Sequence, residues 1–168
     1  KNGKVAATPL KIPHKNLIEL EDNLLLFFTG YSRNAGDILK EQDKKTKQDE
    51  NKMMDNLNFV KDLGFKSKKY LESGKFNQFA ELMNEHWEYK QLRSKQMSNK
   101  NISKWYYDGL KNGAIGGKLV GAGGGGFFFF LAPPCHHEQI RQALPQIKVW
   151  VPFKIDHTGS KVIFYSLY

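Results

Sequence analysis

Glycine is concentrated in one short stretch of this 168-residue chain, directly before a run of four phenylalanines. Eight of the 15 glycines lie between Gly113 and Gly126, and Phe127–Leu131 follows as an unbroken apolar segment. Ordering so many glycines costs conformational entropy, which a fold tolerates where the backbone needs positive φ or a close approach. A flexible linker or a series of tight turns is the alternative, but a linker carries polar residues and Pro, and this stretch has none after Lys118. It therefore predicts a loop that contacts a phosphate or another backbone.

The order of residues around the glycines limits how such a loop holds an anion. Successive backbone N–H groups in a glycine-rich loop form an anion-binding concavity, and Lys118 adds a positive charge nearby. The Walker pattern is absent, because no Gly-Lys-Ser/Thr closes the loop. A strand, not a helix, is predicted after the glycines, so a helix dipole is not what holds the anion.

Composition excludes several classes of protein. A hydrophobic content of 40% is too high for a disordered chain, and the single cysteine cannot form an internal disulfide. No apolar run is long enough to cross a bilayer, and the first residues lack the apolar core of a signal peptide, so we expect a cytoplasmic domain without membrane contact. The net charge of +9 indicates an anionic partner. Nucleic acid is not favoured as this partner. The positive charge is dispersed along the chain, and the phenylalanine run lacks the Lys/Arg-Gly pattern that accompanies aromatic residues in RNA-binding strands.

Strands are predicted in the first and last thirds of the chain, on either side of a helical middle. Continuous apolar runs favour strands that are covered on both faces. Besides the phenylalanine run, the expected strands are Leu17–Leu20, Leu24–Phe28, Lys148–Val151 and Val162–Tyr165, with one short helix at His136–Leu144. Strands, then helices, then strands indicate an α+β domain with a mostly antiparallel sheet and helices packed on one face.

The middle of the chain, residues 32–112, carries apolar residues at helical spacing. Four helices are expected, and their N-terminal residues are of types that cap helices: Ser32 or Asn34, Asp49 or Asn51, the turn at Ser73–Gly74, and Ser98 or Asn99. The buried positions predicted for them are Ala35, Ile38 and Leu39; Met53, Leu57, Val60 and Leu63; Phe76, Ala80, Met83 and Trp87; and Ile102, Trp105, Tyr106 and Leu110.

Five segments together resemble a known family. Gly116–Phe127 resembles the C-terminal motif of the GHMP small-molecule kinases, which act on galactose, homoserine, mevalonate and phosphomevalonate. Phe28–Arg33 is similar to the strand-to-helix segment that opens the C-terminal domain of that family. Asn84–Trp87, Met97–Asn99 and Trp105–Tyr106 most resemble the branch acting on D-glycero-D-manno-heptose phosphate. The resemblance implies one ferredoxin-like C-terminal domain over residues 1–168.

The same resemblance implies which domain of such a kinase binds ATP and supplies the catalytic groups. In this family an N-terminal domain holds ATP with a Gly/Ser-rich loop and supplies the acidic groups for Mg²⁺ and catalysis. The chain has no Gly-Ser-Ser segment. It is therefore expected to be the C-terminal half of an ATP-dependent sugar kinase, inactive without an N-terminal half as partner, with its catalytic residues in that half. A non-catalytic ligand-binding module and a basic nucleic-acid-binding domain are the alternatives.

The resemblance also selects candidate residues for ATP. The glycine loop is expected to brace the phosphate-binding loop of the N-terminal half and to approach the phosphate that is transferred. Its members are Gly121, Ala122, Gly123, Gly124, Gly125 and Gly126. No metal site is expected in this chain, since Cys135, His136 and His137 are adjacent and rarely close a tetrahedral site.

Candidate residues for the sugar substrate are cations and hydroxyls near predicted helix ends, together with the lysine beside the glycine loop. They are Ser32, Arg33, Arg93, Lys95, Ser98 and Lys118. Arg33 suits bidentate binding of a phosphate, and a surface ion pair is its alternative role. Arg93 and Lys95 lie in a stretch without acidic residues, which also suits an exposed helix end. For Ser98 the alternative is a plain helix cap.

Overall fold

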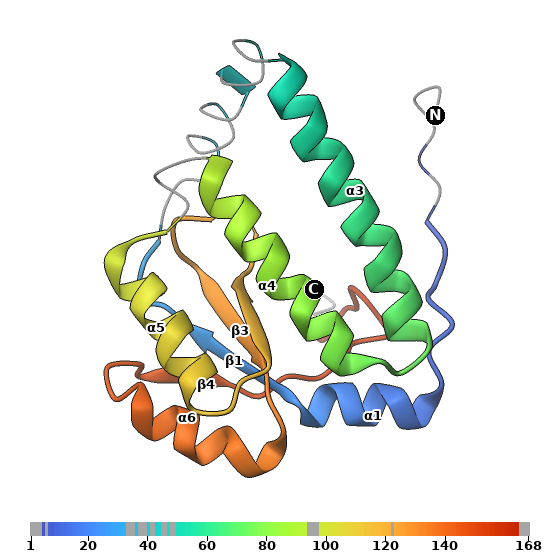
Figure 1. Ribbon diagram of the computed structural model, residues 1–168. Helices are drawn as coiled ribbons and strands as arrows, with labels where there is room; N and C mark the ends of the chain where they lie inside the picture. The colour runs from blue at the N-terminus through green and yellow to red at the C-terminus, as the bar shows by residue number, and fades with distance from the viewer. Residues whose placement is uncertain are drawn as a thin grey trace, which may run out of the picture.

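The computed structural model describes residue 5 and residues 7–32, 50–93, 98–121 and 123–164, together with residues 36, 40, 43, 44 and 47. The helices in this part are α1 (His14–Asp22), α3 (Glu50–Glu72), α4 (Phe76–Arg93), α5 (Lys100–Lys111) and α6 (His137–Ala143), with a 3₁₀ turn at Pro134–His136. The strands are β1 (Leu24–Phe28), β2 (Gly116–Leu119), β3 (Phe127–Leu131) and β4 (Val149–Val151). They form one antiparallel sheet in the order β2-β3-β1-β4 (Figure 1).

The two apolar runs predicted as strands are the centre of this sheet. Strand β1 pairs along its whole length with β3, from Leu24 opposite Leu131 to Phe28 opposite Phe127. Alternate side chains of both strands point into one core, and Phe27, Phe128 and Phe130 are completely buried there. The rings of Phe27 and Phe128 stack with their centres 5.4 Å apart. Burial of these aromatic rings therefore fixes the register of the sheet.

Helices complete two apolar clusters, one on each side of the sheet. The larger cluster holds Trp87 of α4, Trp105 and Tyr106 of α5 and Ile140 of α6 against the phenylalanines. The smaller one joins Leu20 of α1, with Phe76, Ala80 and Met83 of α4, to Leu131. The antiparallel α+β fold expected from the sequence is confirmed, but helices contribute to clusters on both sides of the sheet and not on one face alone. The buried stripes predicted for α4 and α5 are confirmed too, except that Leu110 is only partly buried. None of the helices described is long and apolar enough to span a membrane.

Helix α4 lies along β2, at one edge of the sheet (Figure 1). The Asn84 side chain donates from Nδ2 to the Ile115 carbonyl (3.0 Å) and accepts from the Gly117 N–H at Oδ1 (3.1 Å). Gly116 permits this approach, because a Cβ there would lie 2.1 Å from the Ala80 carbonyl oxygen. A side chain of α4 thus occupies the hydrogen-bonding edge that another strand would otherwise take.

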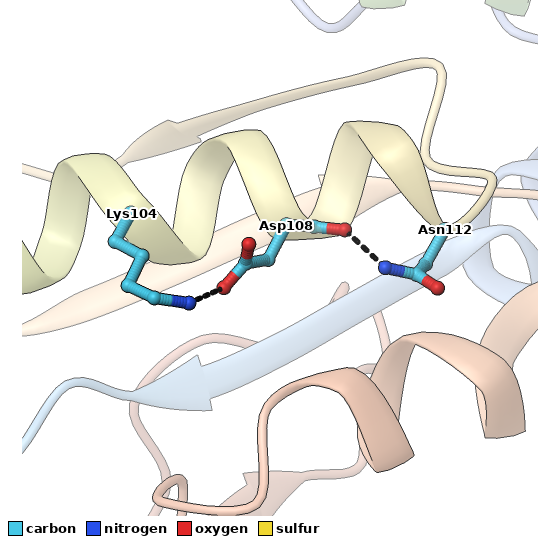
Figure 2. A network of polar contacts seen from close by, with 3 residues as sticks. All are labelled: Lys104, Asp108 and Asn112. Atoms are coloured by element: carbon cyan, nitrogen blue, oxygen red, sulfur yellow. Dashed lines mark hydrogen bonds and ion pairs between the residues drawn. The ribbon is translucent and has the colours of Figure 1, made fainter.

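Helix α5 is capped at both ends by asparagine. Asn99 accepts from the Ile102 N–H (2.9 Å), as an N-cap residue does. At the other end Asn112 donates from Nδ2 to the Asp108 carbonyl (2.7 Å), while the Asp108 carboxylate pairs with Lys104 (2.5 Å; Figure 2). Gly113 follows with φ of 104° and turns the chain towards β2. Both ends of α5 are therefore fixed by side-chain hydrogen bonds to its backbone.

The first predicted strand is wrong, since Leu17–Leu20 belongs to α1. Asn16 and Leu20 are the buried residues of this helix, and Ile18 between them is 45% exposed. Buried residues that lie four positions apart, as Asn16 and Leu20 do, have the spacing of a helix. An apolar stretch of only four residues cannot by itself distinguish a strand from a helix. The helix begins after Pro13, which fixes its own backbone and lacks the N–H that a helix start leaves unused.

Two further expectations are wrong. Residues 162–164 of the strand predicted at Val162–Tyr165 form no strand, and their side chains are 81–92% exposed. A short apolar run forms a strand only beside a partner strand, and the described residues place none next to this one. Leu57 is 47% exposed, because α3 turns Leu63 and not Leu57 towards the core. The helix expected around Ala35, Ile38 and Leu39 falls on residues outside those described.

Candidate active-site wall

The glycine loop, defined here as residues 121–126, connects β2 to β3 at one end of the sheet. Gly121, Gly123, Gly124 and Gly126 all have positive φ, between 74° and 109°. Side chains other than glycine rarely adopt this conformation. Gly123 and Gly124 are also buried, so the loop is folded against the domain. The loop is therefore packed against the domain, as a flexible linker would not be, while the contact with phosphate stays a prediction.

The segment after β1 holds the far end of the loop. The Gly126 N–H donates to the Tyr31 carbonyl (2.7 Å), and the Gly126 carbonyl accepts from both the N–H (2.9 Å) and the hydroxyl (2.8 Å) of Thr29. Thr29 is itself buried. A Cβ on Gly125 would lie 2.5 Å from the Tyr31 carbonyl oxygen, so only glycine allows this close contact. Both the N–H and the carbonyl of Gly126 are therefore used in hydrogen bonds within the domain.

Tyr31 links the loop to the first turn of α5. Its ring stacks on Trp105 with a centre-to-centre distance of 6.0 Å, and its hydroxyl accepts from Asn101 Nδ2 (2.6 Å). The partial positive charge of the α5 N-terminus thus lies at the same end of the sheet as the glycine loop. Two predicted substrate residues are at this end as well. Ser32 is exposed directly after Tyr31, and Ser98 lies just before α5, with Oγ 2.9 Å from Ser103 Oγ.

The beginning of the loop is held by α4. Lys90 is 6% exposed, and its ammonium donates to the carbonyls of Leu119 (3.3 Å) and Gly121 (2.5 Å). Lys90 does not stand out in the sequence, because it is one of several cations between Lys90 and Lys104. One signal was available: Lys90 lies three residues after Trp87, on the apolar stripe of α4, where a lysine is out of place unless its charge has buried partners.

Lys118 points away from the glycine loop. Its Nζ lies 2.5 Å from Nδ1 of His86 on α4, while its neighbour Leu119 faces the phenylalanine core. The side chains of adjacent strand residues point to opposite faces of a sheet, so Lys118 lies on the face opposite to Leu119 and the phenylalanine core. Lys118 and His86 line a cavity of about 220 Å³ between α3, α4 and the sheet, whose other walls include Leu63, Met83 and Phe129.

The remaining candidates fall where the structure describes little or no detail. Arg33, Lys95 and Ala122 lie outside the described residues, and for Arg93 only the backbone is described, as the last residue of α4. Of the predicted residues, the structure therefore brings Ser32, Ser98 and the described glycines of the loop to one end of the sheet. Thr29, Tyr31 and Asn101 join them there without having been predicted.

Metal coordination finds no support in the described part of the chain, where no three His, Cys, Asp or Glu side chains come close enough to hold an ion. Cys135 is exposed. The neighbouring histidines have partners within the protein: His136 Nδ1 lies 3.4 Å from Gln139 Oε1, and His137 Nε2 lies 2.9 Å from the Ala132 carbonyl oxygen.

Comparison with known proteins decides the family. Residues 67–148, which contain α4, α5, β2, the glycine loop and β3, match the family model described as GHMP kinases C terminal. This part of the chain is a GHMP kinase C-terminal domain. D-glycero-alpha-D-manno-heptose 7-phosphate kinase from Campylobacter jejuni is 34% identical over 122 residues, which are 73% of this chain and 35% of that protein. The chain thus spans about a third of the curated relative that it matches.

Solved structures show the same GHMP C-terminal fold. A putative sugar kinase from Campylobacter jejuni is 27% identical and superimposes with a TM-score of 0.59, covering 91% of this chain and 43% of that one. A D-glycero-D-manno-heptose 1-phosphate kinase from Bacteroides thetaiotaomicron gives a TM-score of 0.61 at 22% identity, covering 92% of this chain and 39% of that one. The second likeness concerns the fold alone.

Proposed function

We propose that this chain forms one wall of the active site of an ATP-dependent sugar kinase that phosphorylates a hydroxyl of a heptose-phosphate-like substrate. The observation that carries the proposal is the glycine loop, which is buried at its centre and held between β1, α4 and the end of the sheet where α5 begins. A loop fixed in this way presents backbone in a set position. Phosphoryl transfer depends mainly on positioning and charge stabilisation, so such a wall contributes directly to it.

Within this proposal the glycines have different tasks. Gly126 has its N–H bonded to Tyr31 and its carbonyl bonded to Thr29, so it anchors the loop. Contact with ATP or with its binding loop is therefore assigned to Gly121–Gly125. The positive φ values of Gly121, Gly123 and Gly124 fit a concavity lined by backbone, which suits an anion. Bound ATP would supply the phosphoryl group that is transferred.

Ser32, Arg33, Arg93, Lys95 and Ser98 remain the proposed contacts for the sugar phosphate. Ser32, Arg93 and Ser98 lie at or next to the loop end of the sheet, where β1 and α4 end and α5 begins, while Arg33 and Lys95 are outside the described residues. Lys118 is left out of this group because its ammonium contacts His86 beside α3 and α4. Among the described residues no three His, Cys, Asp or Glu side chains gather to hold an ion, and Mg²⁺ is assigned with the catalytic acidic groups to the N-terminal half.

An N-terminal half is proposed as the partner that supplies the main ATP-binding loop and the catalytic groups. Support comes from the length of the Campylobacter jejuni heptose 7-phosphate kinase, of which this chain covers 35%. The heptose phosphate class of substrate rests on the 34% identity to that enzyme.

Replacing the matching C-terminal part of the Campylobacter jejuni enzyme with this chain tests the proposal. We expect the chimera to phosphorylate D-glycero-D-manno-heptose 7-phosphate with ATP, whereas this chain alone gives no turnover. Thermal unfolding and gel filtration establish that the chimera is folded. A folded chimera that binds the sugar phosphate without turning it over would favour a ligand-binding module, and turnover by this chain alone would refute the division into halves.

A further inference from the structure

Lys90 is a buried cation on the apolar side of α4. Its side chain follows Met83 and Trp87 along the helix and is 6% exposed, against 0% for Trp87. Burying a charge is costly unless hydrogen bonds replace the lost water. Here the replacement is supplied by two backbone carbonyls, those of Leu119 and Gly121. The position near the C-terminal end of the helix also favours a positive charge.

The two carbonyls stand where β2 gives way to the glycine loop. Between them the Val120 N–H points to the opposite side and donates to the Phe127 carbonyl (2.8 Å), so β3 still pairs with the chain at this residue. Gly121 already has a φ of 74° and has left the strand conformation. The ammonium, with three donors, bonds both carbonyls on the side away from β3. It thereby fixes the orientation of the first peptide groups of the loop.

Asn84 provides an internal comparison on the same helix. It satisfies one carbonyl and one N–H at the start of β2, where a neutral amide has the matching donor and acceptor. At the end of β2 two acceptors face α4, and a lysine supplies donors together with a positive charge. Both residues protect the edge of β2, but only Lys90 bonds to the glycine loop itself.

We propose that Lys90 is a positioning residue for the glycine loop. It holds the entry of the loop in the conformation that meets phosphate and places a buried positive charge behind that backbone. Tyr31 and Thr29 fix the exit of the loop in the same way, so the loop is fastened at both ends. The importance of this for catalysis rests on the kinase function proposed above, whereas the effect on loop conformation does not.

The test compares Lys90→Met, which keeps the length of the side chain and removes its charge, with Asn84→Leu as the matched control on the same strand edge. In this chain, the amide NMR signals of the glycine loop are expected to shift and to exchange faster in Lys90→Met, while those of β1 and α5 stay unchanged. In the chimera, Lys90→Met should raise KM for ATP at least about ten-fold. Asn84→Leu should lower the melting temperature and leave KM for ATP within about two-fold.

Each outcome decides the proposal. Unchanged loop signals in Lys90→Met overturn it, and so does an equal rise in KM with Asn84→Leu, which would mean that lost stability alone is responsible. If Lys90→Met fails to fold, Lys90→Arg is the deciding variant, because it keeps the positive charge and several hydrogen-bond donors. Loop signals close to those of the native chain would then support the positioning role. Loss of these signals in Lys90→Arg would overturn it. If the native chimera is inactive although the loop signals respond to Lys90, the kinase function fails and the positioning role stands.

Discussion

The individual glycines of the loop are required for different physical reasons. At Gly121 and Gly126 a Cβ would meet nothing within 4 Å, so positive φ alone favours glycine there. At Gly125 no positive φ is found, and the requirement is space, because the Tyr31 carbonyl oxygen occupies the position of a Cβ. Glycine is thus required at Gly121 and Gly126 because it adopts positive φ, and at Gly125 because it leaves room for a neighbouring backbone.

Alanine substitutions at two of these glycines should separate the two requirements. We expect Gly125→Ala to lower the free energy of unfolding by about 1–3 kcal/mol, because backbone must move to admit the methyl group. Gly121→Ala should cost about 1–2 kcal/mol through strain at positive φ. Urea unfolding measures both changes. Gly125→Ala alone should alter tryptophan fluorescence, since Tyr31 stacks on Trp105; the same spectrum in both variants would contradict the close contact.

At the scale of elements, helix α4 both fills the core and covers the edge of β2. One side of it fills the core with Trp87, and the neighbouring side runs along β2, where Asn84 and Lys90 bond to the strand edge. An uncovered edge presents unpaired N–H and C=O groups that attract other chains. Covering it with polar side chains of a helix makes β2 dependent on α4 for its hydrogen bonds.

Asn84→Leu tests this dependence directly. The variant leaves the Ile115 carbonyl and the Gly117 N–H without their partner, which should lower the free energy of unfolding by about 1–3 kcal/mol. Amide hydrogen exchange should become faster in β2 than in β1. Gln142→Ala on α6, whose exposed side chain bonds to the exposed Glu138, is the control and should change stability by less than about 0.5 kcal/mol. Equal losses in the two variants would show that the edge contact contributes little.

At the scale of the whole molecule, a contact between distant parts of the chain holds the C-terminal segment to α1. Glu21 accepts from the Ile155 N–H (2.9 Å) and from Lys154 Nζ (2.6 Å), more than 130 positions later in the sequence. These hydrogen bonds lower the pKa of Glu21 below its ordinary value of 4.5, with the bond from Lys154 as the largest cause. The segment after β4 is thereby tied to α1, where Ile155 also packs against the cluster that contains Leu20.

This contact predicts a specific dependence of stability on pH. A carboxyl group whose pKa is lower in the folded state stabilises the fold above its unfolded pKa, and that contribution is lost as pH falls through the folded value. Glu21→Gln should therefore be less stable than the native chain at pH 7 and equally stable once the pH is below the folded pKa. Urea unfolding across this range, with Glu19→Gln on the same helix as control, measures the difference. A constant difference at all pH values would contradict the assignment.

Local features of the sequence determined much of this protein. The phenylalanine run was predicted correctly as a strand, although Phe127 is 42% exposed. The stripes of α4 and α5 were predicted because aromatic and aliphatic side chains at helix spacing are buried in almost any fold. The N-cap at Asn99 and the glycine turn before β3 are equally local, since each follows from the conformation that its own residues prefer. The resemblance of that turn to the kinase motif agreed with the family found by comparison.

Only the tertiary structure decided which polar groups meet. Lys118 is adjacent to the loop in sequence but faces α4 because of the alternation within a strand, and Lys90 is distant in sequence but bonds to the loop. Likewise Leu17–Leu20 became helix once Leu20 could pack on Leu131, and residues 162–164 stayed out of the sheet without a neighbouring strand. A sequence specifies local conformation through each residue's own preferences, but hydrogen bonds between α4 and the β2 edge exist only after the core has brought those elements together.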